Sequence, residues 1–163
     1  NESQPTTTTS ATKYRLNFNH PCKELIFAQE TSEIERTFAN DGATVVASSG
    51  NAAATGAGGV TVTTAQLKLN GHDRFSEQDG AYFNYVQPNA HHSNTPSDGI
   101  NVYSFALNPE EHQPSGTCNM SRIDNAELNV KWNANVGSTC HIFATNYNVL
   151  RIMSGMGGLA YSN

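Results

Sequence analysis

The segment from Ile100 to Trp132 constrains the fold more strongly than any other part of this 163-residue sequence, because it contains two alternating stretches separated by turns. In residues 126–132 apolar and polar side chains alternate strictly, so a strand there has one buried face and one face in water. In residues 100–107 both alternating sets contain apolar side chains, so that strand has contacts on both faces. Together the two stretches predict an all-β fold, an antiparallel β-sandwich.

Two turns separate these strands. Asn108 and Pro109 end the first stretch, because proline has no backbone N–H to donate to a neighbouring strand. Pro114, Ser115 and Gly116 form a second bend, in which the glycine can take a positive φ. Two turns so close together leave little room for a flexible loop.

The segment SFALNPEEHQPSGTCNMSRIDNAEL, residues 104–128, resembles a signature of the major capsid proteins of nucleocytoplasmic large DNA viruses, which include phycodnaviruses, iridoviruses and mimiviruses. Three further blocks agree with this family in the family's order, and together the blocks cover most of residues 14–163. Residues 1–13 and 30–64 carry no family pattern. The further blocks are LNFNHPCKELIF at 16–27, LNGHDRF at 69–75 with YFNYVQPNAHHSNTP at 82–96, and NVLRIMSGMGGLAYSN at 148–163.

The resemblance implies a viral jelly roll. Members of the family carry two jelly rolls in tandem, and the blocks in this chain match the second, C-terminal one. The two sheets of a jelly roll are named BIDG and CHEF by their strands, and counting back from the C-terminus leaves strands B and C without a counterpart. The assigned strands are D at 14–18, E at 23–29, F at 65–70, G at 100–107, H at 121–132 and I at 138–153.

Missing strands B and C would leave each sheet with an unpaired edge. We therefore expect that the chain does not fold stably by itself, and that the rest of the same polypeptide or a neighbouring chain supplies the missing strands. A compact, cooperatively unfolding monomer in size-exclusion experiments would contradict this expectation.

Composition and glycine content suggest further divisions of the chain. Residues 1–13 are polar and of low complexity, so we expect a flexible arm or a cut end. Residues 14–163 form the partial C-terminal jelly-roll domain, interrupted by a surface insertion at 30–59 that is rich in small residues. Near the C-terminus, Gly155 breaks the last strand, and residues 159–161 can pair as a short final segment.

One short helix is predicted at residues 82–86, where apolar side chains follow helical spacing. Ser76 and Asp79 form a weak capping box before this helix. Pro88 is expected to end it, because proline interrupts the hydrogen-bond pattern of a helix.

Charge and cysteine content limit the possible partners and compartment. The net charge of -5 gives no electrostatic support for binding a phosphate backbone, so we expect no direct nucleic-acid partner. No apolar run approaches the roughly 18 residues of a membrane span, so we expect no transmembrane segment. Cys22, Cys118 and Cys140 form no CxxC pair, which favours free thiols in a reducing compartment and synthesis and assembly in the host cytoplasm.

Histidines in predicted loops are the first candidates for a metal site, but no further ligands accompany them at a recognisable spacing. Structural hydrogen bonding is the better interpretation, and we expect no metal. The residues concerned are His72, His91, His92 and His112.

A catalytic site is not supported either. Cys118 lies near His112 and Ser115, but no nucleophile motif accompanies them, so a turn explains the segment better. Glu110 and Glu111 are neighbours rather than opposed carboxylates, and we interpret them as part of a solvated turn. We therefore expect that the chain is not an enzyme and has no cofactor.

The resemblance implies a structural role in the virion capsid. The protein would form trimeric, pseudo-hexagonal capsomers of an icosahedral double-stranded DNA virus shell. Its partners would be the identical subunits of a homotrimer, neighbouring capsomers and minor capsid proteins. Our candidates for assembly or packing contacts are Tyr103, Phe105, Leu107, Pro109, Pro114 and Trp132, of which the first three either pack against the neighbouring jelly roll or fill the domain's own core.

A carbohydrate-binding, lectin-like β-sandwich is the alternative function. Its site would use the aromatic and polar side chains of residues 82–85 and 91–98. Selective glycan binding by a monomer would favour this alternative, whereas concentration-dependent assembly into trimers would favour the capsid protein.

Overall fold

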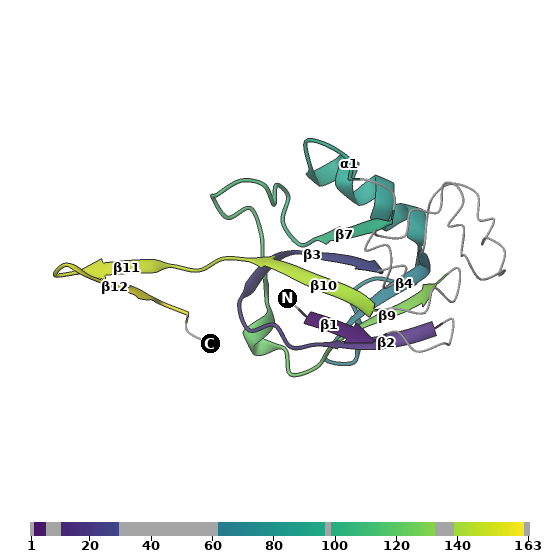
Figure 1. Ribbon diagram of the computed structural model, residues 1–163, viewed down its shortest axis with the longest axis horizontal. Coiled ribbons are helices and arrows are strands. Elements are labelled where there is room, and N and C mark those ends of the chain that lie inside the picture. Colours follow the sequence, from purple (N-terminus) through teal and green to yellow (C-terminus); the bar gives the residue numbers. More distant parts are fainter. Residues whose placement is uncertain (1, 6–10, 30–61, 97–98, 133–138, 162–163) are drawn as a thin grey trace.

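Two antiparallel sheets pack against each other in the computed structural model, which describes residues 2–5, 11–29, 62–96, 99–132 and 139–161 (Figure 1). Both sheets contribute side chains to one hydrophobic core between them. The predicted all-β, antiparallel sandwich is therefore confirmed.

The strands follow a definite order in space. The first sheet has the order β1 (Glu2–Pro5), β10 (Thr139–Asn146), β3 (Pro21–Gln29) and β7 (Ile100–Ser104), and β8 (Cys118–Asn119) also pairs with β3. The second has the order β2 (Ala11–Leu16), β9 (Ala126–Trp132), β4 (Val62–Leu69) and β5 (His72–Asp73), and β6 (Gln78–Asp79) also pairs with β4. A separate hairpin consists of β11 (Leu150–Met153) and β12 (Met156–Leu159).

This order corresponds strand by strand to the two sheets of a jelly roll. β1, β10, β3 and β7 occupy positions B, I, D and G, and β2, β9, β4 and the short β5 and β6 occupy C, H, E and F. The predicted absence of strands B and C was therefore wrong. The segments at 14–18, 23–29 and 65–70 each move by one position, to strands C, D and E.

The strand that was not expected, β1, and the first residues of β2 come from the polar N-terminal segment. β1 pairs with β10 from Glu2 to Pro5, and β2 pairs with β9 from Ala11 onward, so a flexible arm over 1–13 was wrong for these residues. Edge strands pair through backbone groups on one side only, and polar side chains are common there, so apolar alternation is not needed. With both positions filled, the reason for expecting an unstable chain no longer applies.

The core confirms the alternation predicted for residues 126–132. In β9 the four residues of the apolar set are all buried, and they face the buried set of the first sheet. The register of β4 shifts between Val62 and Thr64, which restores a buried position at Ala65. The largest fully buried apolar side chains are Tyr14, Phe27, Phe83, Leu25, Leu67, Leu128, Ile142, Val62 and Val130.

A helical segment lies against β7 (Figure 1). Its first part, η1 (Tyr82–Val86), is a π-helical turn that continues directly into α1 (Gln87–His91). The predicted short helix is confirmed, but Pro88 does not end it. Pro88 lies in the first turn of α1, a position that tolerates proline because backbone N–H groups there lack intrahelical partners.

The predicted capping box before this helix does not form. No side chain caps the N-terminus of η1, and Asp79 instead accepts a hydrogen bond from the Ala81 N–H at 2.9 Å. Ser76 accepts a hydrogen bond from Gln78. Among the described residues, no helix has the length and apolar character that a bilayer span needs.

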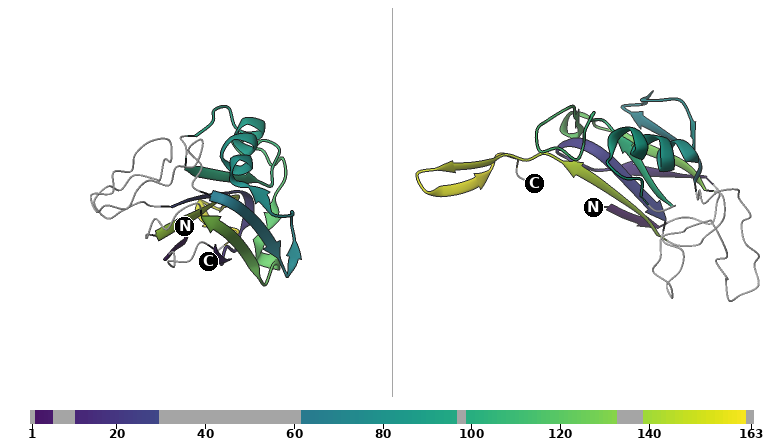
Figure 2. Two further views of the ribbon diagram at one scale, coloured as in Figure 1. Left: turned by 90° about the vertical axis from the view of Figure 1, so that its right-hand side faces the viewer. Right: turned by 90° about the horizontal axis from the view of Figure 1, so that it is seen from above.

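The predicted last strand at 138–153 is divided in the structure. β10 ends at Asn146, and after three further residues the chain forms the β11–β12 hairpin, which projects away from the sandwich (Figures 1 and 2). Ser154 and Gly155 at its turn have φ values of 52° and 76°, as a two-residue hairpin turn of type I′ requires. We call residues 150–159 the hairpin arm. The predicted insertion at 30–59 lies outside the described residues.

The pair formed by Tyr14 and Trp132 offers a test of the core. The Trp132 Nε1–H donates a hydrogen bond to the Tyr14 hydroxyl at 3.2 Å, and both side chains are buried. We expect Trp132→Phe to lower the free energy of unfolding by about 1–3 kcal/mol, because a buried hydrogen bond and part of the packing are lost. Denaturant unfolding would measure this change. Leu150→Ala, at an exposed position of the hairpin arm, is the control, and an equal loss in both variants would contradict the expectation.

Candidate functional site

The helical segment closes the open edge of the first sheet with buried amide side chains. The N–H of Ser104 in β7 donates to Gln87 Oε1 at 3.1 Å, and the carbonyl of Ile100 accepts from Asn84 Nδ2 at 3.0 Å. Both backbone groups point away from β3. Phe105 follows Ser104 and therefore directs its backbone groups to the opposite side, where its N–H donates to the Lys23 carbonyl of β3. A covered edge cannot recruit another strand.

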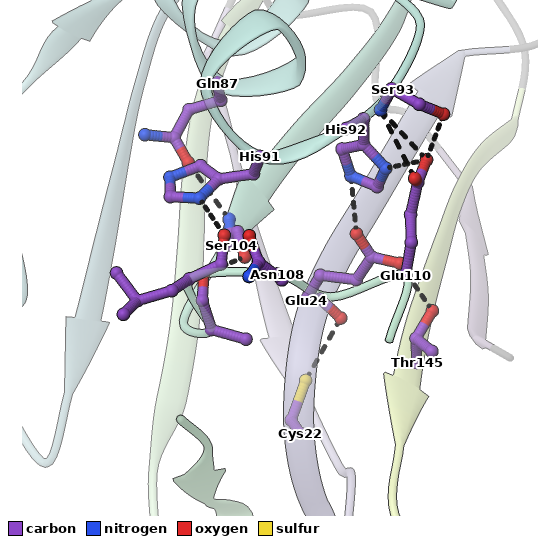
Figure 3. Close-up of polar contacts among 12 residues, drawn as sticks. Cys22, Glu24, Gln87, His91, His92, Ser93, Ser104, Asn108, Glu110 and Thr145 are labelled. Carbon is purple, nitrogen blue, oxygen red and sulfur yellow. Dashed lines mark hydrogen bonds and ion pairs between the residues drawn. The ribbon is translucent and has the colours of Figure 1, made fainter. Parts of the chain in front are cut away.

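A second set of polar contacts connects the helix to β3 and to the connection after β7 (Figure 3). His92 Nε2 lies 2.9 Å from Glu24 Oε2, and His92 Nδ1 lies 3.2 Å from Glu110 Oε1. The other carboxylate oxygen of Glu24 accepts a hydrogen bond from the Thr145 hydroxyl at 2.9 Å. We call Glu24, His92, Ser93, Glu110 and Thr145 the histidine–carboxylate cluster.

Charge in this cluster is partly shielded from water. The Glu24 side chain is 7% exposed and that of His92 16%, whereas that of Glu110 is 48% exposed. The His92–Glu24 contact is close but does not meet the geometry of a hydrogen bond, and it is an ion pair only when the imidazole is protonated. A protonated imidazole has one N–H for each of the two carboxylates.

Glu110 holds its loop to the end of the helix. Its carboxylate accepts hydrogen bonds from the Ser93 N–H at 3.3 Å and from the Ser93 hydroxyl at 3.2 Å, besides its contact with His92. These contacts, the Ser93 N–H foremost, lower the pKa of Glu110. Glu110 lies in an exposed turn, as the sequence indicated, and its carboxylate also binds the end of the helix.

The connection from 105 to 117 is held by its own hydrogen bonds. The Asn108 N–H donates to the Ser115 hydroxyl at 2.9 Å, and that hydroxyl donates to the Asn108 carbonyl at 3.2 Å. Gly116 has a φ of +140°, and a Cβ there would lie 2.9 Å from the Phe105 carbonyl oxygen. The bend predicted at this glycine is confirmed, and the close approach of two backbones explains why glycine is needed.

The structure places the six predicted assembly or packing residues in different surroundings. Tyr103 is buried in the core, and Phe105 packs against the core with its ring centroid 5.1 Å from that of Tyr103. Trp132 is buried in the same core, and Pro109 is also buried. Leu107 is 70% exposed, and Pro114 is exposed.

The residues considered for catalysis are occupied or unreactive. Burial raises the pKa of Cys118, which lowers the fraction of reactive thiolate, and the Ser115 hydroxyl is bonded to Asn108. Burial also raises the pKa of Cys22 and of Cys140 to about 12, and all three thiols are free. In the part of the chain that the structure describes, no group of three or more His, Cys, Asp or Glu side chains is arranged so that it could hold a metal ion.

Several of the side chains considered for a lectin site have partners inside the protein, although Tyr85 is exposed. The Tyr82 hydroxyl accepts from Gln87 Nε2 at 2.7 Å, and Phe83 and Asn84 are buried. His91 Nδ1 lies 2.9 Å from the Leu107 carbonyl, so this nitrogen carries the proton. Residues 97 and 98 of the predicted sugar site lie outside the described residues.

Sequence reasoning missed the partners of His92. Glu24 precedes the apolar residues of β3, and its place on the outer face follows from their alternation, but no spacing connects it to a histidine in a distant helix.

The Asn70-Gly71 dipeptide is a clearer sequence signal, because this pair favours a two-residue hairpin turn. Both residues have positive φ, 51° and 81°, and turn β4 into β5.

Glu110 predicts a dependence of stability on pH. Its folded-state pKa is lowered, so its contribution is present above the unfolded-state pKa of about 4.3 and is lost as the pH falls through the folded-state value. We expect Glu110→Gln to remove part of the acid-induced loss of stability, measured by denaturant unfolding across pH. Glu111→Gln removes the same charge and is the matched control. Identical pH profiles for Glu110→Gln and the unsubstituted chain would contradict this role.

The close approach at Gly116 leads to a second prediction, about the stability of the 105–117 connection. We expect Gly116→Ala to lower the free energy of unfolding by about 1–3 kcal/mol, because its Cβ meets a backbone oxygen and the positive φ is strained. Gly158→Ala is the control, since a Cβ there meets nothing within 4 Å. Thermal unfolding of both variants compares them directly, and equal midpoints would count against the close approach.

Comparisons with known proteins agree with this fold. Residues 1–158 match the family model of large eukaryotic DNA virus major capsid proteins. The major capsid protein of Pyramimonas orientalis virus is 46% identical over 94% of this chain and 40% of its own length. That of Paramecium bursaria Chlorella virus 1 is 40% identical over 98% of this chain and 45% of its own length. The chain thus spans less than half of these relatives.

A solved structure described as a quasi-atomic model of the PBCV-1 virus capsid has the same fold. It matches with a TM-score of 0.79 and 35% identity, and the match covers 99% of this chain and 49% of that chain. The matching relatives are named as capsid proteins, as the resemblance in the sequence implied. The chain belongs to the family of major capsid proteins of large eukaryotic DNA viruses.

Proposed function

We propose that this chain supplies one jelly roll of a double-jelly-roll subunit, and that three identical subunits form a pseudo-hexagonal capsomer of an icosahedral double-stranded DNA virus shell. The carrying observation is that a complete set of jelly-roll strands matches about half of a solved capsid chain, 49% of its length. The remaining half has room for a second body of similar size. Three subunits with two such bodies each would give a roughly six-sided outline.

The closed edge of β7 supports this use. Since Asn84 and Gln87 occupy the backbone groups of β7 from the side, neighbouring subunits meet this edge through side chains and not through strand pairing. Side-chain contacts select particular partners, because they depend on shape and charge at each position.

Two of the predicted packing residues are candidates for contacts between subunits. Leu107 and Pro114 are exposed on a connection that Gly116 and the Ser115 hydroxyl hold in place. A rigid exposed connection loses little conformational entropy when it docks. Buried Tyr103, together with Phe105, Pro109 and Trp132, would act indirectly, by supporting the body that presents these contacts.

The remaining partners follow from the same proposal. Neighbouring capsomers and minor capsid proteins would contact the outside of the trimer, and the net charge of -5 favours no direct contact with nucleic acid. Three free cysteines are consistent with synthesis and assembly in the reducing host cytoplasm.

Native mass spectrometry of capsomers released from purified particles tests the proposal. We expect one dominant species with three copies of the subunit, and sedimentation velocity should show the same species forming as concentration rises. Capsomers that contain a different number of copies would contradict the proposal, as would selective glycan binding by a chain that remains monomeric at all concentrations.

A further inference from the structure

The hairpin arm exposes apolar side chains that the described part of the chain leaves uncovered. Five of the ten exposed large apolar side chains among the described residues lie on it, and every described residue of β11 and β12 is exposed. An isolated two-stranded hairpin is marginally stable in water, so this arm requires a partner. The five are Leu150 at 64%, Ile152 at 69%, Met153 at 55%, Met156 at 74% and Leu159 at 62% exposure.

The base of the arm is fixed to the sandwich, although the arm itself projects (Figures 1 and 2). The Tyr147 N–H donates to the Pro21 carbonyl at 2.9 Å, and the Tyr147 hydroxyl donates to the Gln113 carbonyl at 3.1 Å. Asn148 Nδ2 donates to the Tyr161 carbonyl at 2.9 Å across the two ends of the hairpin. These contacts determine the direction of the arm, so it is presented to a partner at a defined angle.

The two faces of the arm differ in chemistry. Register places Leu150 and Leu159 opposite each other on an aliphatic face, which also carries Ile152. The other face carries Arg151, the arm's one charged residue, together with two methionines, whose flexible side chains adapt to irregular surfaces. This second face combines apolar contact with a positive charge in a chain whose net charge is -5.

Exposed apolar and acidic side chains also occur at and near α1. Val86 precedes this helix and is 53% exposed, and Leu107 is 70% exposed, with its carbonyl 2.9 Å from His91 at the last turn. The two exposed apolar side chains thus belong to the two ends of α1. Exposed Glu111 follows Leu107 in the same connection and supplies a negative charge. We call Val86, Leu107 and Glu111 the α1 surface.

We propose that the hairpin arm of one copy packs on the α1 surface of a second copy, with Arg151 facing Glu111. The arm and α1 of one chain lie far apart in Figure 1 and in the right view of Figure 2, so an arm on the α1 surface must come from another copy. The inference rests on the proposed function, because assembly brings many copies of this chain together. Arm and acceptor are different surfaces, so the contact is heterologous and can close into a ring of subunits.

A charge exchange between the two surfaces tests this contact. We expect Arg151→Glu and Glu111→Arg each to raise the dissociation constant of self-association at least about tenfold in sedimentation velocity. The double variant should recover most of the affinity, because the opposite charges face each other again. Arg151→Lys keeps the charge and is the matched control. Both positions are exposed, and thermal unfolding of each variant checks that the fold is retained.

The outcomes separate this inference from the proposed function. Trimers that form equally well with Arg151→Glu would overturn the arm contact and leave the capsomer proposal standing. Single variants that weaken association without recovery in the double variant would overturn the α1 surface as the acceptor. An unsubstituted chain that shows no self-association at any concentration would contradict both proposals.

Discussion

Backbone hydrogen bonding at the edges of the two sheets is the constraint on which this structure depends. A sandwich buries its inner faces readily, but each outermost strand leaves a row of N–H and C=O groups without partners. On one side the strands β1 and β2 extend the sheets, and on the other side Asn84 and Gln87 bind two of the free groups of β7. The helical segment is therefore part of the sheet's edge as well as its cover.

The contacts of the histidine–carboxylate cluster are polar, so they affect the position of the connection more than the stability of the fold. The close contact between His92 and Glu24 adds little net stability compared with an apolar contact of the same volume, because both groups lose hydration. The neighbouring contacts determine where the loop lies, because Glu110 and Ser93 attach the 105–117 connection to one end of the helix. The cluster thus fixes the position of the connection that carries exposed Leu107.

The sequence predicted those features that depend on local chemistry. Alternation in 126–132 and the bend at Gly116 were both identified, because each follows from neighbouring side chains or from one φ value. β1 was missed because an edge strand needs only backbone pairing, which leaves no apolar pattern to detect. The His92–Glu24 pair and the projection of the hairpin arm depend on distant segments meeting in space, and periodicity carries no such information.

Burial of Cys22 and Cys140 affects the chemical reactivity of the core. Cys22 and Cys140, with pKa values of about 12, remain almost wholly protonated at neutral pH, and only the deprotonated form attacks a disulfide or an oxidant efficiently. At neutral pH these two thiols therefore react slowly with oxidants. The core that contains them keeps its free sulfhydryl groups in oxidising as well as in reducing surroundings.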